Sequence, residues 1–411
     1  MLLGACGSDK DEESTSTDTA ADDAGADAGG DTASGDKVIK IGLIAPLSGD
    51  LSALGLGMRN SVQLAVDQAN ESGELGDWTI EFVPEDDTAK PEVGAQVAAK
   101  MASDDAVVGV VGTLNSSVAL SVQPVLDKAG IVMISPANTN PALTQGDDPA
   151  NPKRPYEHYF RVATTDAIQG PFAAAYAKEI GKVNAAVIHD NKAYGKGLAE
   201  AFAKQFEADG GKIVATEVIN PDDKDFNAVI SKIKDLNPDL IYYGGEYPQA
   251  GPLSNQAKAA GLNVPVFGGD GIYDGKYIEL AGDTSAGDLA TSVGAPPEKL
   301  DTAKDFIAAY EAAGFDDGYS AYGPQAYDAA NVIIESVKTA MEGRDAVDDE
   351  AKAAILEAVQ AASITGATGA IAFDMYGDNT TKILTVYKVD TSTKPEDAGK
   401  LTWVDVKTGE F

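Results

Sequence analysis

The residues best suited to hold a small charged molecule stand in two hydroxyl-rich turns, and each turn follows a short apolar run. The valine-rich run Val107–Val111 predicts a buried strand, and Ser116 stands after it where a helix would begin. A second apolar run, Ile131–Ile134, predicts another strand and leads into the turn Ser135–Asn140. Two strand ends would therefore bring hydroxyls and free backbone N–H groups to one edge of a parallel sheet.

These two turns predict an anion-binding site, because helix N-termini present unpaired N–H donors and a partial positive charge. Neither turn contains Lys or Arg, so the pattern favours a carboxylate held by neutral donors over a polyphosphate. The alternative interpretation is that Ser116 and Ser135 only cap and turn the chain. Two such turns together, each after a buried strand, favour the binding interpretation.

Strand-like and helix-like segments alternate about every 30 residues, which is typical of parallel α/β architecture with ligands beyond the carboxyl ends of the strands. The pattern restarts near Phe160–Asp166, which predicts a second lobe, and the Gly-punctuated stretch Leu54–Gly57 is expected to be a loop passing close to a ligand. Strands are predicted at 37–47, 78–83, 107–111, 131–134, 185–189, 212–218, 240–243, 264–267, 289–293, 370–373, 382–389 and 401–406. Helices are predicted at 58–70, 91–103, 116–129, 169–180, 226–236, 249–260, 300–313, 322–341 and 350–361.

The composition excludes some classes of partner. The 411 residues suffice for two domains with full cores, and 44% hydrophobic and 23% charged residues are typical of a globular chain. Apolar runs stay well below the roughly 18 residues of a membrane span. The net charge of −34 argues against nucleic acid or an anionic membrane surface, since both would repel it, but not against a small zwitterion in a pocket.

The first 36 residues differ from the rest. Met1–Ser8 resembles the end of a bacterial lipoprotein signal peptide, in which Cys6 would become the acylated N-terminal residue and anchor the protein outside the cytoplasmic membrane. A stray terminal cysteine is the alternative. Residues 9–36 are Asp, Glu, Ser, Thr, Ala and Gly with Lys10 as the only base, so they are expected to form a disordered, extended tether rather than a core.

Catalytic chemistry finds little support in the sequence. The histidines are His158 and His189 and the one cysteine is Cys6, so neither a zinc cluster nor a Cys/His pair can be assembled. Neither GxSxG nor the phosphate-binding GxxxxGK[ST] occurs, and adjacent acids such as Asp86 and Asp87 point apart on a strand. The sequence therefore predicts no enzyme, no metal and no cofactor.

The segment GTLNSSVALSVQPVLDKAGIVMISPANTNPAL resembles the ligand-cradling segment of periplasmic branched-chain amino-acid (leucine/isoleucine/valine) binding proteins, which are type I solute-binding proteins of ABC importers. The similarity continues from about Lys37 to the C-terminus. It implies an α/β fold of two Rossmann-like lobes with parallel sheets, joined by three hinge crossings near Ala163–Asp166, Thr291–Ala295 and Ile371–Asp374. The expected division is 1–36 as signal remnant and tether, 37–164 with 295–372 as the first lobe, and 165–294 with 373–411 as the second.

The resemblance also assigns roles to individual residues. Ser116 and Thr139 would offer donors to a ligand carboxylate, and the carbonyl of Ala137 would accept from the ligand ammonium. Asp270 would neutralise that ammonium, and Tyr194 would close over the ligand from the second lobe. Tyr322 matches an aromatic residue of the first lobe.

Some positions depart from the family pattern. Leu54 stands where known members have Tyr, and Glu246 replaces a Tyr of the cleft, which favours either extra contact with the ammonium or a polar ligand side chain. Ala89 and Asn115 stand where known members carry a disulfide. The predicted ligand-binding set is Ser116, Ala137, Thr139, Tyr194, Asp270, Glu246, Leu54, Asn115 and Tyr322.

The expected function is capture of an α-amino acid, branched-chain above all, by a monomeric extracytoplasmic lipoprotein that delivers it to an ABC permease. Its place would be the outer face of the cytoplasmic membrane. Two alternatives remain open: a receptor for another small ligand such as an amide, an aromatic acid or a polar amino acid, and a sensor that signals to a partner protein.

Overall fold

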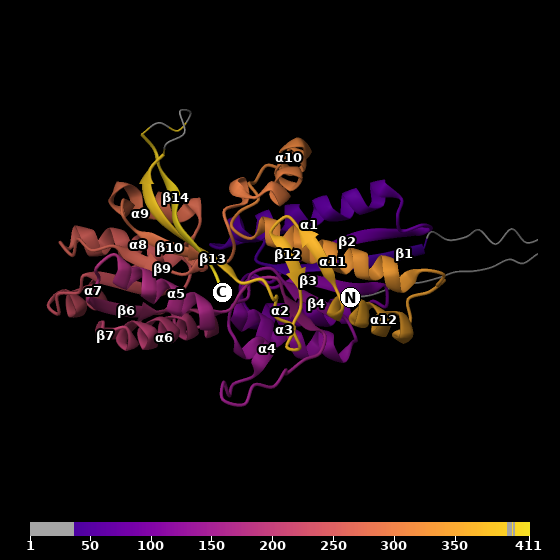
Figure 1. Cartoon of the computed structure of the whole chain (residues 1–411), viewed down its shortest axis with the longest axis horizontal. Helices are drawn as coiled ribbons and strands as arrows, with labels where there is room; N and C mark the ends of the chain where they lie inside the picture. Colours follow the sequence, from indigo (N-terminus) through magenta and orange to yellow (C-terminus); the bar gives the residue numbers. More distant parts are fainter. Residues whose placement is uncertain (1–36, 393–396, 398) are drawn as a thin grey trace, which may run out of the picture. The chain divides into compact units, whose positions relative to one another are not determined.

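The computed structural model describes residues 37–392, 397 and 399–411. These residues form two lobes, each built on one sheet with helices packed against it (Figure 1). The predicted lipidation site Cys6 and the acidic segment 9–36 lie outside the described residues. Within the described part, no helix combines the length and apolar character that crossing a membrane requires.

The first lobe contains a five-stranded parallel sheet in the order β2-β1-β3-β4-β5. Every residue of β3 and β4 is buried, which explains why their sequences are continuous apolar runs rather than alternating ones. The strands are β1 (Lys37–Ala45), β2 (Trp78–Asp86), β3 (Val107–Gly112), β4 (Val132–Ser135) and β5 (Tyr159–Arg161).

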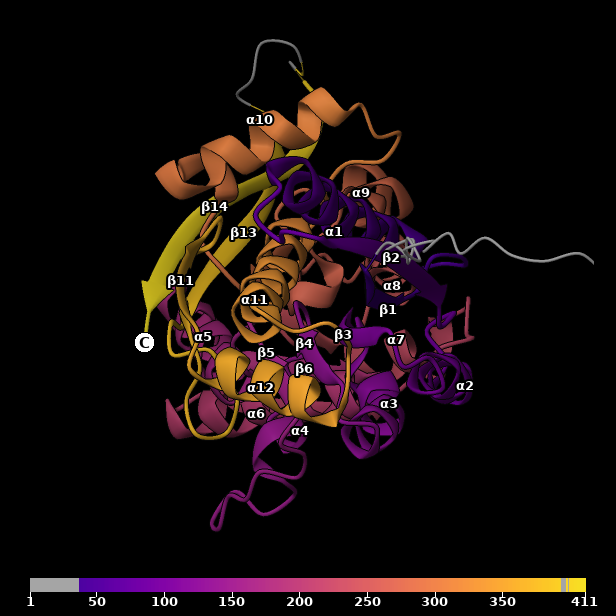
Figure 2. The ribbon, with the colours of Figure 1, turned by 90° about the vertical axis from the view of Figure 1, so that its right-hand side faces the viewer.

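Helices that pack against one another cover this sheet. Helix α1 packs against α11, and α2 packs against α3 (Figure 2). The covering helices are α1 (Ser52–Ser72), α2 (Pro91–Ala102), α3 (Ser116–Lys128), α11 (Gly323–Met341) and α12 (Asp349–Gln360), and the lobe also contains α4 (Ala142–Gln145), α10 (Lys304–Ala313) and the hairpin of β11 (Ser363–Gly366) and β12 (Gly369–Ala372).

The second lobe contains a seven-stranded mixed sheet in the order β14-β13-β10-β9-β8-β6-β7. Strand β13 is antiparallel to its neighbours β10 and β14, and the other pairings are parallel. Its strands are β6 (Asn184–His189), β7 (Lys212–Val218), β8 (Leu240–Gly244), β9 (Val266–Gly268), β10 (Leu289–Ser292), β13 (Ile383–Thr391) and β14 (Leu401–Glu410). Its helices are α5 (Asp166–Glu179), α6 (Ala193–Ala208), α7 (Asn227–Lys234), α8 (Tyr247–Ala259) and α9 (Gly275–Ala281).

The chain crosses between the two sheets after β5, after β10 and after β12, so three connections join the lobes. The first and third connections lie side by side. The Arg161 amide donates to the carbonyl of Gly377 at 3.0 Å, and the Asn379 amide donates back to the carbonyl of Arg161 at 3.1 Å. The buried Arg161 guanidinium also pairs with Asp378, with 2.5 Å between Nε and Oδ1. The expected fold of two α/β lobes with three crossings is confirmed.

The stretch Leu54–Gly57 is not a loop, because α1 already begins at Ser52. Its glycines serve close packing instead: a Cβ on Gly55 would lie 2.0 Å from the carbonyl oxygen of Pro46. Helix α6 was not predicted either, although its buried residues Leu198, Phe202 and Phe206 stand at helical spacing. The three-residue strand β5 is too short to carry a periodic signal.

Candidate ligand-binding site

The carboxyl ends of β3, β8 and β9 meet at one small cavity between the lobes. All the predicted ligand-binding residues except Thr139 line it, together with Leu114 and Gly271, which were not predicted. The cavity encloses about 20 Å³, which is room for about one water molecule. The full lining is Leu54, Leu114, Asn115, Ser116, Ala137, Tyr194, Glu246, Asp270, Gly271 and Tyr322.

The first lobe contributes the N-terminus of α3. Asn115 is the N-cap residue, with φ −86° and ψ 130°, and Ser116 opens the helix. The Ser116 hydroxyl accepts from the amide of Asn140 at 3.4 Å, and the first backbone amides of α3 have no partner within the helix. Neutral donors and the positive end of a helix therefore face the cavity, which suits a carboxylate.

Thr139 lies just behind this wall. It is 1% exposed, and its hydroxyl lies beside the buried carboxyl of Asp166: burial raises the pKa of Asp166, and the Thr139 hydroxyl opposes that shift. Its carbonyl accepts from the amide of Asp166 at 2.8 Å, at the first residue of α5. Thr139 thus joins the first lobe to the start of the second through its carbonyl and its hydroxyl.

The second lobe contributes Asp270, which is 2% exposed and follows β9. Its Oδ1 accepts from the Tyr194 hydroxyl at 2.8 Å and from Gln169 Nε2 at 3.0 Å, and its Oδ2 accepts from the Tyr322 hydroxyl at 2.8 Å. All three donors are neutral. Within the described chain no Lys, Arg or His forms an ion pair with Asp270. Burial raises the pKa of this carboxyl, so a cationic ligand group beside it would supply the missing counter-charge.

Gly271 explains how Tyr194 reaches this carboxylate. The Gly271 amide donates to the Tyr194 hydroxyl at 3.0 Å. A Cβ on Gly271 would lie 2.9 Å from the Tyr194 ring, so only glycine permits this approach without displacement of the ring.

Glu246 makes two contacts that hold it in place. It is 4% exposed at the N-cap of α8. Its Oε1 accepts from Asn115 Nδ2 at 2.7 Å across the lobes, and its Oε2 pairs with Lys192 Nζ at 3.0 Å. Lys192 was not predicted to be near the site. Burial lowers its pKa, but the charges of Glu246 and Asp190 outweigh burial and raise it. Glu246 is therefore already neutralised and is a weaker candidate for the ammonium than Asp270.

Two further buried carboxyls lie beside the cavity. Burial raises the pKa of Asp190 to about 8, with a further contribution from the charge of Glu246. Burial and the charge of Asp270 likewise raise the pKa of Asp166 to about 8. Asp166 accepts from Gln169 Nε2 at 3.0 Å, and Gln169 Oε1 accepts from the amide of Asp270 at 3.0 Å. Gln169 thereby ties the first crossing to the loop that carries Asp270.

Arg161 supports the turn that carries Ala137 and Thr139. Its Nη1 donates to the carbonyls of Asn138 at 3.0 Å and Asn140 at 2.8 Å, and the Asn138 side chain donates to the carbonyl of Leu114 at 2.8 Å. These contacts fix both hydroxyl-rich turns relative to each other. Sequence spacing did not reveal them, because Arg161 reaches the turn only once β4 and β5 pair.

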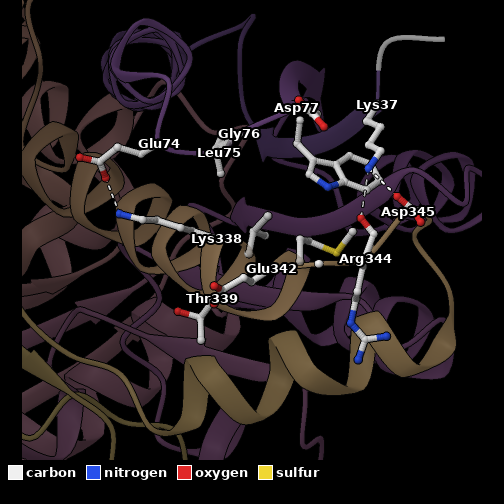
Figure 3. A pocket seen from close by; sticks show the side chains of 14 residues that line it. Lys37, Glu74, Leu75, Gly76, Asp77, Lys338, Thr339, Glu342, Arg344 and Asp345 are labelled. Atoms are coloured by element: carbon white, nitrogen blue, oxygen red, sulfur yellow. Dashed lines mark hydrogen bonds and ion pairs between the residues drawn. The ribbon is translucent and has the colours of Figure 1, made fainter. Parts of the chain in front are cut away.

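A larger groove of about 580 Å³ lies at the opposite edge of the first sheet (Figure 3). It is lined by the starts of β1 and β2 and the end of α11, including Lys37, Trp78, Lys338 and Asp345. Lys37 Nζ lies 2.7 Å from Asp345 and 5.5 Å from the centre of the Trp78 ring, and Lys338 pairs with Glu74. Two ion pairs thus form within this groove. The groove lies at the amino ends of the strands rather than at the ligand-binding edge.

No group of three or more His, Cys, Asp or Glu residues in the described part of the chain is arranged to hold a metal ion. The polar groups around the cavity would suit a zwitterion. Hydroxyls and a helix N-terminus face it from the first lobe, and a carboxylate faces it from the second.

The sequence is similar to those of known binding proteins. The sequence model described as periplasmic binding protein matches residues 38–395. The leucine-, isoleucine-, valine-, threonine-, and alanine-binding protein of Pseudomonas aeruginosa is 34% identical over 351 residues, which cover 85% of this chain and 89% of that protein.

Solved structures agree on the fold. The branched-chain amino acid transporter substrate binding protein LivJ of Streptococcus pneumoniae, in complex with isoleucine, matches with a TM-score of 0.75 and 27% identity, covering 90% of this chain and 100% of that one. An ABC transporter solute binding protein of R. palustris, in complex with 4-hydroxybenzoate, matches with a TM-score of 0.78 and 22% identity over 91% of this chain and 97% of that one. The second likeness concerns the fold alone.

Proposed function

The chain belongs to the periplasmic binding protein family, among the substrate-binding proteins of branched-chain amino-acid ABC transporters, and from this premise we propose that it captures an α-amino acid in the cavity between its lobes. The main support for the proposal is that the buried carboxylate of Asp270 is held by neutral donors alone. It faces the same cavity as the N-terminus of α3. Family members of this kind bind solutes and are not enzymes.

The proposed binding mode uses both ends of this arrangement. The ligand carboxylate accepts hydrogen bonds from Ser116 and Thr139 at the mouth of the first sheet. The ligand ammonium pairs with Asp270 and donates to the carbonyl of Ala137. An ammonium beside Asp270 replaces an uncompensated buried charge with a charge-assisted hydrogen bond. Tyr194 and Tyr322 orient Asp270 and cover the ligand.

This charge arrangement favours an amino acid over an aromatic acid such as that of the R. palustris structure. A benzoate would satisfy the donors of α3 but would leave Asp270 without a cation. It would also bring a second negative charge close to the first, which raises the free energy of the bound state. The charge balance of the site therefore supports a zwitterion.

Ligand entry requires one lobe to rotate away from the other and open the cavity, because the cavity encloses only about 20 Å³. We propose that the crossings near 163–166, 291–295 and 371–374 act as hinges, with residues 37–164 and 295–372 moving against residues 165–294 and 373–411. The paired first and third crossings, joined by Arg161 and Asp378, would keep this motion to a rotation rather than a separation of the lobes.

The proposed cellular location of the protein and its proposed partner proteins follow from its N-terminal segment and its family. We propose that Cys6 carries the lipid, that the protein is a monomer held at the outer face of the cytoplasmic membrane, and that it delivers its ligand to an ABC permease. Intact-mass analysis of the protein isolated from native membranes tests the lipid. A mature chain that begins at an acylated Cys6 supports it, and an unmodified Cys6 contradicts it.

A ligand screen tests the capture of amino acids. The protein is unfolded, freed of carried-over ligand, refolded and melted in the presence of each of the twenty amino acids, small amides and 4-hydroxybenzoate. A ligand that binds only the folded state raises the melting temperature. We expect a rise with one or more neutral amino acids. A rise with an amide or 4-hydroxybenzoate and with no amino acid would replace this function by that of a receptor for the other ligand.

A further inference from the structure

We propose that Asn115 and Glu246 form a side-chain subsite that selects amino acids bearing a neutral hydrogen-bond donor, a hydroxyl or a carboxamide, over aliphatic ones. The inference rests on the proposed capture of an α-amino acid and names the ligand class more narrowly. Both residues line the cavity, both are about 4% exposed, and they bond to each other across the two lobes.

The orientation of the Asn115 amide follows from its partner. The Glu246 carboxylate can only accept hydrogen bonds, and Lys192 occupies its Oε2 at 3.0 Å. The Asn115 group 2.7 Å from Oε1 must therefore be Nδ2, because the flipped amide would bring two acceptors together. Lys192 and Glu246 together thus determine that Nδ2 of Asn115 is hydrogen-bonded and that Oδ1 is the atom without a partner within the described part of the chain.

Asn115 Oδ1 is a hydrogen-bond acceptor. Asn115 Oδ1 is buried and has no hydrogen-bond partner among the described residues. A buried acceptor without a donor is costly, whereas a ligand hydroxyl or amide N–H beside it would satisfy it. Asn115 therefore favours a ligand that carries a hydrogen-bond donor at this position.

The head group of the ligand does not use this acceptor in the proposed binding mode. Ser116 and Thr139 take the carboxylate, and Asp270 takes the ammonium. The remaining lining residues on the first lobe that can contact a side chain are Leu54 and Leu114 beside Asn115. A side chain that places an apolar carbon against these leucines and a donor against Asn115 Oδ1 fits this combination.

The subsite also disfavours charged side chains. An acidic side chain would place a carboxylate against the acceptors Asn115 Oδ1 and Glu246, and repulsion would exclude it. A basic side chain would find Glu246 already paired with Lys192. A neutral donor avoids both conflicts.

Threonine and valine provide the sharpest test, because they have nearly the same size and differ by a hydroxyl in place of a methyl group. Asparagine and leucine form a second such pair for the carboxamide. Calorimetric titration of the refolded, ligand-free protein measures the dissociation constants. We expect threonine, asparagine or both to bind about tenfold or more tightly than the aliphatic partner, because the aliphatic side chain leaves a buried acceptor unpaired.

The variant Asn115→Leu removes the acceptor at similar size, and the preference should then vanish or reverse in favour of the aliphatic member. Asn227→Leu at an exposed position is the matched control and should keep the wild-type preference. Thermal melting of each variant verifies that it folds.

Two results overturn the inference while the proposed function stands: valine and leucine binding at least as tightly as threonine and asparagine, or an unchanged preference in a folded Asn115→Leu variant. If no amino acid binds the wild-type protein at all, the proposed function fails and the subsite fails with it. Binding of aspartate or glutamate in preference to all neutral amino acids would also contradict the subsite.

Discussion

The Tyr322 hydroxyl donates to Asp270 Oδ2 at 2.8 Å, and this bond joins the two lobes across the cavity. Tyr322 directly precedes α11 in the first lobe, and Asp270 follows β9 in the second. With Tyr194 and Gln169 on its other oxygen, Asp270 is held in one orientation by three neutral donors. The carboxylate is thus positioned by the protein but has no positively charged partner among the described residues.

Asp270→Asn should abolish most amino-acid binding while preserving the fold. The amide keeps the shape of the side chain but cannot pair with an ammonium, so affinity should fall by about tenfold to a hundredfold, the worth of a hydrogen bond to a charged group. The melting temperature of the ligand-free protein should stay equal or rise, since a buried uncompensated charge is removed. Calorimetry and thermal melting measure both quantities, with the exposed Asp283→Asn as control. Unchanged affinity in the folded variant would remove Asp270 from the site.

Ser116→Ala should weaken binding by roughly threefold to tenfold, because one hydroxyl donor to the ligand carboxylate is lost while the backbone amides of α3 remain. Ser117→Ala is the matched control: it changes the same residue type one position further along α3, and Ser117 does not line the cavity. An equal loss in both variants would point to weakening of the helix N-terminus rather than to contact with the ligand.

Arg161→Met should destabilise the protein by about 3–5 kcal/mol, because it leaves the buried carboxylate of Asp378 without its partner. The Arg161 charge, against the effect of burial, holds the pKa of Asp378 below its usual value. Urea unfolding measures the free energy of unfolding. Lys299→Met breaks the far more exposed pair with Asp405 and should cost less than about 1 kcal/mol. Similar losses in both variants would argue against a structural role of the Arg161–Asp378 pair at the crossings.

Stability should fall as the pH rises from about 4 to about 8, in part because of Asp166. Burial and the charge of Asp270 raise the pKa of Asp166 from 3.8 to about 8 in the folded protein. In that window the folded state binds more protons than the unfolded state, so the free energy of unfolding decreases with increasing pH. Asp166→Asn should therefore show a smaller drop in melting temperature between pH 5 and pH 8 than the wild type. Asp222→Asn, at an exposed position, should keep the wild-type drop in melting temperature. If Asp166→Asn also keeps that drop, Asp166 does not hold a proton in the folded protein at these pH values.

The sequence predicted the parts of the structure that depend on local pattern. Buried runs such as Val107–Val111 and the caps around Ser116 are local, and their periodicity and turn chemistry placed β3 and α3 within a residue of their observed bounds. The resemblance brought Asp270 to the same cavity as Ser116, which spacing alone could not do. The family-level expectation of a two-lobed binding protein was confirmed.

What the sequence did not reveal depends on contacts between distant segments. Lys192 neutralises Glu246 only because β6 and β8 are neighbours in the sheet. The start of α1 at Ser52 was hidden by its glycines, which permit close packing against Pro46 rather than a loop. Arg161 was overlooked as a support of the site for the same reason, since its partners lie in the turn 138–140 and at Asp378.

The most direct test of the central claim compares an α-amino acid that binds with the same molecule lacking only its ammonium group. Calorimetric titration of the refolded protein with threonine and 3-hydroxybutanoate, or with leucine and 4-methylpentanoate, isolates the pairing of Asp270 with the ammonium. We expect heat of binding from the amino acid and none from its des-amino acid. Equal affinity for the two members of a pair would show that Asp270 does not hold a ligand cation.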